Sequence, residues 1–76
     1  MNKASVSKLM KALKWIEAAK VTLEEVLDKE QIAYDNMPES FQDCEKGEEA
    51  AEAIDKMESA LSSTEEVMEY INEILT

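Results

Sequence analysis

Residues 35–47 read Asp-Asn-Met-Pro-Glu-Ser-Phe-Gln-Asp-Cys-Glu-Lys-Gly, and this stretch decides the fold. It holds the only proline of the chain, Pro38, and its only glycine, Gly47. Proline disfavours a helical conformation in the residue before it, and Asn36, Ser40 and Gly47 are residue types that cap helices or turn the chain. Because the rest of the sequence has helical periodicity, the stretch predicts a hinge between two helices.

Both segments that flank the hinge repeat apolar residues every three and four positions, which is the pattern of an amphipathic helix. We expect one helix over residues 6–35, with its cap at Ser5 or Ser7. We expect the hinge over residues 36–46, where a separate short helix after the proline is also compatible with the sequence, and a second helix over residues 47–75. The 76 residues then form one domain.

The apolar residues of each helix follow a seven-residue repeat, in which positions a and d form the seam that faces the partner helix. The seam of the first helix comprises Val6, Leu9, Leu13, Ile16, Leu23, Leu27, Tyr34 and Met37. Lys20 and Glu30 interrupt it with polar side chains. The seam of the second helix comprises Ala50, Ile54, Met57, Leu61, Thr64, Met68, Ile71 and Leu75.

A third apolar column runs along both helices at position g, on the same side of an antiparallel pair. It comprises Ala12, Ala19, Val26, Ala33, Ala53, Ala60, Val67 and Ile74. A two-stranded coiled coil needs only two apolar positions in seven, so the third column predicts burial against a further neighbour. The predicted fold is an all-α, antiparallel, coiled-coil-like two-helix hairpin that completes a four-helix bundle by dimerisation or by docking on a partner.

The composition argues against an enzyme. The chain has no histidine and one cysteine, Cys44, so it cannot form an intramolecular disulfide, a structural zinc site or a histidine-based nucleophile pair. The acidic run from Asp43 places its glycine at the fifth position instead of the sixth, so it does not match a calcium-binding loop. We therefore expect no catalytic residues, no cofactor and no metal ion.

The charge distribution bears on partners and location. The net charge is −10 and there is no arginine, so direct nucleic-acid binding is not expected. Residues 1–20 carry +4 and residues 21–76 carry −14, and an antiparallel hairpin places these opposite charges side by side. No apolar stretch reaches the roughly 20 residues of a membrane span, and the start lacks the apolar core of a signal peptide. We expect a cytoplasmic protein with no membrane contact.

Two aromatic residues outside the seams mark a candidate contact surface. Trp15 and Tyr70 occupy c positions, and antiparallel pairing brings them to the open end of the hairpin. With Val67 and Ile74 they are expected to form one apolar patch, the composition of an interface centre. The alternatives are that the two aromatic rings pack on each other within a monomer or lie isolated on the surface.

Two further surfaces are candidates for partner binding. Acidic side chains project along the predicted rod as phosphates do along a duplex, and Glu65, Glu66 and Glu69 represent this surface in the second helix. A basic, nucleic-acid-binding groove of a partner protein would accept it, whereas ordinary solvation of a helix surface is the alternative. At the closed end, Phe41 and Ile32 form a second candidate contact surface.

The hinge also carries a family resemblance, through an Asp-Asn-x-Pro-Glu-Ser segment followed by Gly-Glu and an acidic helix. The matching residues are Glu30, Gln31, Asp35, Asn36, Pro38, Glu39, Ser40, Gln42, Gly47 and Glu48. In this pattern the chain resembles a group of small, acidic, uncharacterised proteins of bacteriophages and prophages. The resemblance implies a bacterial host cytoplasm, and it transfers no catalytic residue because the group has no activity to carry over.

Together these features lead to two functional hypotheses. The first is a non-catalytic, phage-encoded inhibitor or modulator that binds a host protein of the defence or nucleic-acid-handling class. The second is a self-associating structural or assembly protein, a homodimeric bundle without an inhibitory role.

Overall fold

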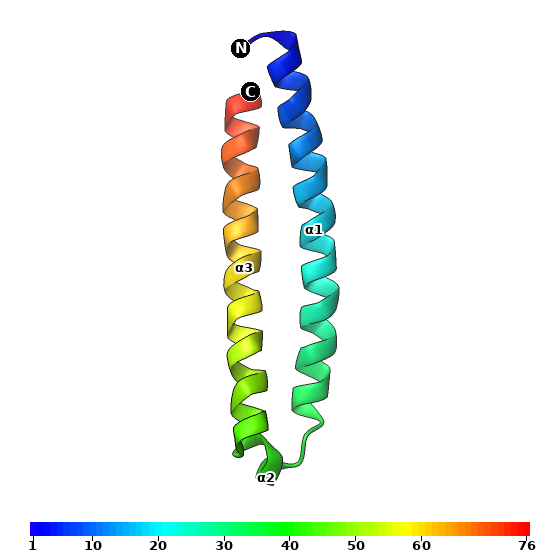
Figure 1. The fold of residues 1–76 in the computed structure, drawn as a ribbon, viewed down its shortest axis with the longest axis vertical. Helices are drawn as coiled ribbons and strands as arrows, with labels where there is room; N and C mark the ends of the chain where they lie inside the picture. Colours follow the sequence, from blue (N-terminus) through cyan, green and yellow to red (C-terminus); the bar gives the residue numbers. More distant parts are fainter.

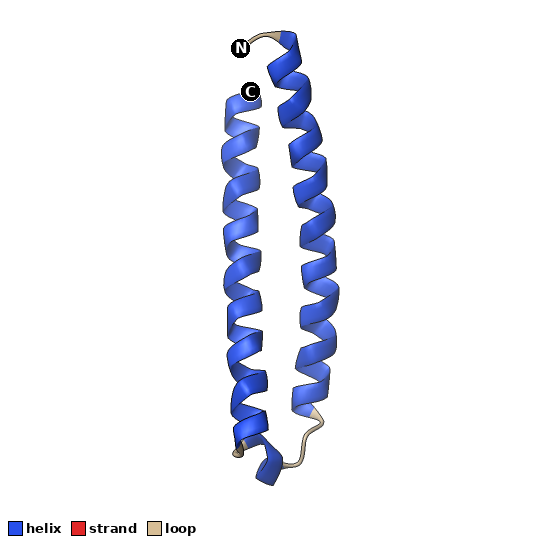
Figure 2. Ribbon diagram, viewed as in Figure 1, coloured by secondary structure: helices blue, strands red, loops and turns tan.

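The computed structural model describes residues 1–76 and contains helices but no strands (Figure 1, Figure 2). Helix α1 spans Lys3–Asp35, α2 spans Glu39–Gln42 and α3 spans Glu45–Leu75. The two long helices α1 and α3 run antiparallel along a rod of 58 × 15 × 15 Å, and both termini lie at its open end. The all-α hairpin predicted from the sequence is confirmed.

Helix α1 begins at Lys3 rather than at residue 6, because the cap is Asn2 and not Ser5 or Ser7. The Asn2 side-chain oxygen Oδ1 accepts a hydrogen bond from the Ser5 backbone N–H at 2.8 Å. Asparagine caps a helix about as well as serine does. Because the cap is Asn2, α1 begins three residues earlier than expected, which adds nearly one turn of helix. The expected serine caps are therefore wrong.

The hinge contains a short helix, α2, which the sequence was compatible with but did not require. Asn36 ends α1 in a helical conformation, and Pro38 has the extended conformation that precedes α2. Cys44 is the cap residue before α3, which begins at Glu45 rather than at residue 47. The hinge is thus a helical corner, and α2 packs against the start of α3.

Gly47 lies inside α3 and does not turn the chain, since its backbone angle φ is not positive. It is one of only two buried residues. A Cβ atom at this position would lie 2.6 Å from the carbonyl carbon of Gln42 and would also collide with the carbonyl oxygens of Phe41 and Gln42. A glycine is therefore required so that the backbone of α2 can lie directly on α3.

Gln42 fixes the same corner to the end of α1. Its side-chain Nε2 donates to the backbone oxygen of Tyr34 at 2.9 Å and to that of Met37 at 3.3 Å. Both acceptors lie at the end of α1 or just beyond it, where helical carbonyls have lost their helical partners. One amide thus links α2 to the C-terminal end of α1.

The seam is where the sequence predicted it. Every a and d residue named above as apolar is partly or fully buried, and Glu30 is exposed. The heptad positions and a Lys20–Glu65 ion pair place Leu23 level with Leu61 and Lys20 level with Thr64. Because only one helix covers each seam, Ile54, which is 5% exposed, is the only buried side chain of the molecule.

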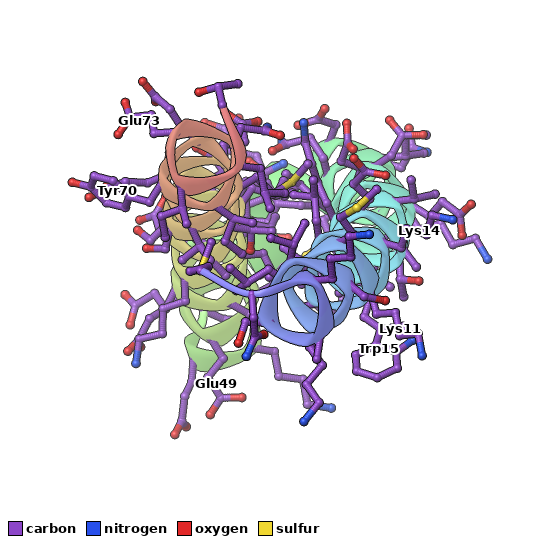
Figure 3. The ribbon with its side chains drawn as sticks, turned by 90° about the horizontal axis from the view of Figure 1, so that it is seen from above. Lys11, Lys14, Trp15, Glu49, Tyr70 and Glu73 are labelled. Atoms are coloured by element: carbon purple, nitrogen blue, oxygen red, sulfur yellow. The ribbon has the colours of Figure 1, made fainter.

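Charges of opposite sign meet across the seam at one point. Lys20 Nζ lies 3.5 Å from Glu65 Oε1, and the other ion pair, Lys56–Glu52, lies within α3. Lys11 and Lys14 point away from α3 (Figure 3). The basic half of α1 therefore lies beside the acidic end of α3, but its other lysines form no ion pair with that end.

Candidate interaction surface

The apolar column at position g forms one continuous surface along both helices. We call this surface the g face; it consists of Ala12, Ala19, Val26, Ala33, Ala53, Ala60, Val67 and Ile74. The seam between α1 and α3 covers only Ala12 and Ala60 in part, and the other six residues are exposed. Val67 is 45% exposed and Ile74 is 54% exposed. The hairpin by itself therefore leaves its third apolar column uncovered.

The opposite side of the seam, formed by the e positions, is polar. It carries Glu17, Glu24, Gln31, Glu58, Glu65 and Asn72, with Met10 and Ala51 at its two ends. An open groove on this side, near the open end, is lined by Lys20, Glu65, Met68, Glu69, Asn72, Glu73 and Thr76. The hairpin thus has one apolar and one polar flank, and these flanks face opposite ways.

The predicted contact residues of α3 are divided between these two flanks. Glu65 and Val67 are two positions apart, which corresponds to roughly 200° around an α-helix. Val67 and Ile74 lie on the g face, whereas Glu65 and Glu69 line the polar groove. A single flat partner surface cannot contact both sets at once.

Trp15 and Tyr70 do not form the single patch expected from the sequence. Trp15 is 71% exposed and Tyr70 is 57% exposed, and the two rings point away from each other, from opposite outer edges of the helix pair (Figure 3). The Tyr70 hydroxyl donates to Glu66 Oε1 at 3.3 Å, one turn earlier in α3. Within one chain the two aromatic side chains therefore border the g face and do not contact each other.

The closed end exposes two large apolar side chains, Phe41 at 58% and Ile32 at 53%. Ile32 occupies an f position on the outer side of α1, and Phe41 lies on α2, which packs on α3. Tyr34, which the seam holds, is partly buried. Phe41 and Ile32 thus belong to different helices, and each is open to solvent.

The sequence-based interpretation missed two residues that position these surfaces. Gln42 holds the corner through its two hydrogen bonds, and Lys20 supplies the only ion pair between α1 and α3. Lys20 carried a signal, because a single basic residue at an a position commonly specifies register. Gln42 appeared only as a match in the hinge resemblance, and its structural role could not be predicted, since its two acceptors are backbone oxygens that only the folded hinge brings together.

No group of three or more cysteine, aspartate or glutamate side chains is arranged to hold a metal ion. None of the helices combines the length and the apolar character needed to cross a bilayer. All eighteen acidic side chains are exposed.

Comparison with known protein families, with characterised proteins and with solved structures finds no match to this chain.

Proposed function

We propose that the chain is a non-catalytic protein-binding protein, a phage-encoded modulator of a bacterial host protein, that works as part of a helical bundle completed through the g face. The observation that carries this proposal is the uncovered apolar g face on a molecule with one buried side chain. A core in a chain of this size supplies only about 3–5 kcal/mol, and a contiguous apolar surface of this kind marks an interaction site. The phage setting comes from the resemblance of the hinge.

The exposed acids support a second mode of binding, in which the polar flank contacts a basic protein surface. The net charge of −10 over 58 Å amounts to about one charge per 6 Å, whereas duplex DNA carries one per roughly 1.7 Å. The rod is thus about three times less densely charged than the duplex. Mimicry of nucleic acid is therefore the weaker of the two modes, and the apolar g face is the stronger basis for binding.

A set of four baits tests the proposal in extracts of a bacterial host. The baits are the wild type, Val67→Glu on the g face, Asn72→Glu on the polar flank, and a Glu65→Lys/Glu69→Lys double variant. Val67→Glu and Asn72→Glu add the same charge five positions apart in α3, the first on the apolar g face and the second on the polar flank. We expect a partner that binds the g face to be lost from the Val67→Glu bait and retained by the two polar-flank baits. A partner that binds the acidic flank should instead be lost from the Glu65→Lys/Glu69→Lys bait and retained by Val67→Glu.

Competition with duplex DNA separates the two modes of binding. A partner held in a basic groove by the acidic flank is released by DNA, and a partner held by the g face is not. If all four baits capture the same proteins, or none captures a specific one, the proposed function is wrong.

A homodimeric assembly protein without an inhibitory role is the second candidate, and the same g face favours it. A bait that captures only further copies of this chain would support that candidate over the host modulator.

A further inference from the structure

We infer that, where no host protein is bound, a second copy of this chain covers the g face, and that the two copies pair around a two-fold axis parallel to the rod. In this arrangement α3 of each copy lies on α1 of the other, and the two open ends coincide. The inference rests on the proposed use of the g face in bundle formation and names its occupant. It is carried by the area of the face, by the sizes of its side chains and by the charges of the two helices.

The area suits a stable pair. The residues of the g face extend over 21 positions of each helix, roughly 32 Å, in the middle of a rod 58 Å long and 15 Å wide. Two rods in contact along their full length share a footprint of at most about 870 Å², and a standard interface buries about 800 Å² per partner. Five of its eight residues are alanines, which let helix backbones approach closely, as in a four-helix bundle. A second hairpin has the same length and width, so it covers the whole face.

The sizes of the g residues are self-complementary. The seam register places Ile74 level with Ala12 and Val67 level with Ala19. When α3 lies on α1 of a second copy at the same level, each of these large side chains meets an alanine. The remaining large residue, Val26, is level with Ala60. No two large g residues of different copies meet along these α1–α3 contacts.

The charges decide which helix lies on which. Helix α3 has ten acidic residues and two lysines, a net charge of −8, whereas α1 has six of each and is neutral, with its basic half at the open end. The other face-to-face arrangement, with the two-fold axis across the rod, would place α3 on α3 and bring −8 against −8. The parallel axis instead places each acidic helix between two copies of α1 and sets the basic half of α1 beside the acidic end of α3.

The same arrangement gives the bordering aromatic residues a partner. Trp15 and Tyr70 occupy c positions at nearly the same level of the rod, on opposite edges of one hairpin. The two-fold axis brings Trp15 of one copy to the edge that carries Tyr70 of the other. The one unfavourable pairing is Lys29 level with Lys56, where Glu52, 3.3 Å from Lys56, supplies an opposite charge.

Sedimentation equilibrium tests the second copy. We expect the wild type to have twice the 8.6 kDa chain mass, and Val67→Glu to raise the dissociation constant about 100-fold, because the symmetric interface buries the added charge twice. Asn72→Glu, the matched control, leaves the dissociation constant within about two-fold of wild type, since its side chain lies on the polar flank. Circular dichroism establishes that the variants are helical.

Distance measurement between spin labels tests the axis without altering the g face. A single label at Ser7→Cys in a Cys44→Ser background is expected to lie about 15–30 Å from its copy across the parallel axis, and about 45 Å away if the axis crosses the rod. A wild type that stays monomeric, a dimer unaffected by Val67→Glu, or a 45 Å distance overturns the inference. A monomeric wild type refutes the second copy alone, because the proposed function fails only if the four baits capture no flank-dependent partner.

Discussion

Replacing Gly47 with alanine tests the corner between α2 and α3, because two opposing effects of known size compete there. In an ordinary helix interior, Gly→Ala stabilises by about 1 kcal/mol. Here the added Cβ would lie 2.6 Å from the carbonyl carbon of Gln42, so α2 must move off α3. That movement breaks the two Gln42 hydrogen bonds, each worth about 1 kcal/mol, and exposes the packed backbone. We expect a net loss of about 1–2 kcal/mol.

Urea unfolding followed by circular dichroism, at one fixed protein concentration, measures this loss. For a chain of this size the expected change lowers the unfolding midpoint by about 1 M. Glu48→Ala, on the exposed neighbouring residue, is the control and should change the unfolding free energy by less than about 0.5 kcal/mol.

A double-mutant cycle sharpens the test. If alanine at position 47 already breaks the Gln42 hydrogen bonds, then adding Gln42→Ala costs little more, and the two losses are not additive. A Gly47→Ala variant that is about 1 kcal/mol more stable than wild type would show that α2 does not pack on α3 as described.

Three further changes probe the seam and the hinge. Ile54→Ala, at the only buried side chain, should lower the unfolding free energy by about 2–4 kcal/mol, measured by urea unfolding; a loss under 1 kcal/mol would contradict its burial. Gln42→Glu cannot donate to the two carbonyl oxygens and should cost about 1–3 kcal/mol, with faster amide hydrogen exchange at the end of α1. Lys20→Met removes a partly exposed ion pair worth at most about 1 kcal/mol and adds an apolar side chain to the seam, so thermal unfolding should show equal or greater stability. A clear loss with Lys20→Met but not with Glu65→Gln would mean that the lysine has a role beyond this pair.

The hairpin was predictable because the seam repeats over many turns, so one misassigned residue does not change the face that is predicted to be buried. Local details were less predictable. Asn2 and Ser5 are comparable as helix caps. The choice between them depends on which side chain accepts a hydrogen bond from a backbone N–H of the first turn, and in the structure this is Asn2. Gly47 was identified as important for the wrong reason. A sequence cannot distinguish a glycine that turns the chain from a helical glycine whose missing side chain lets another backbone segment pack against the helix.

The candidate site was predictable in composition but not in shape. The g face could be assigned from periodicity alone, and its exposure follows because no third long helix covers it. The single patch of Trp15 and Tyr70 failed because both residues were placed by level along the rod and not by direction around it. The c positions of two antiparallel helices lie on opposite outer edges, so equal height brings their side chains no closer.

The position of both termini at the open end has a mechanical consequence. Force applied through the two ends opens the seam one layer at a time, starting at Leu9 and Leu75 and moving toward Gly47. Only a few side chains resist at any moment, so the hairpin unzips at low force. Force applied between Asn36 and Thr76, at opposite ends of the rod, instead runs through the continuous backbone of α2 and α3 and stretches α3 against its own helical hydrogen bonds. The seam therefore bears the load when the hairpin is pulled by its two ends, and the hydrogen bonds of α3 bear it when the pull runs along that helix.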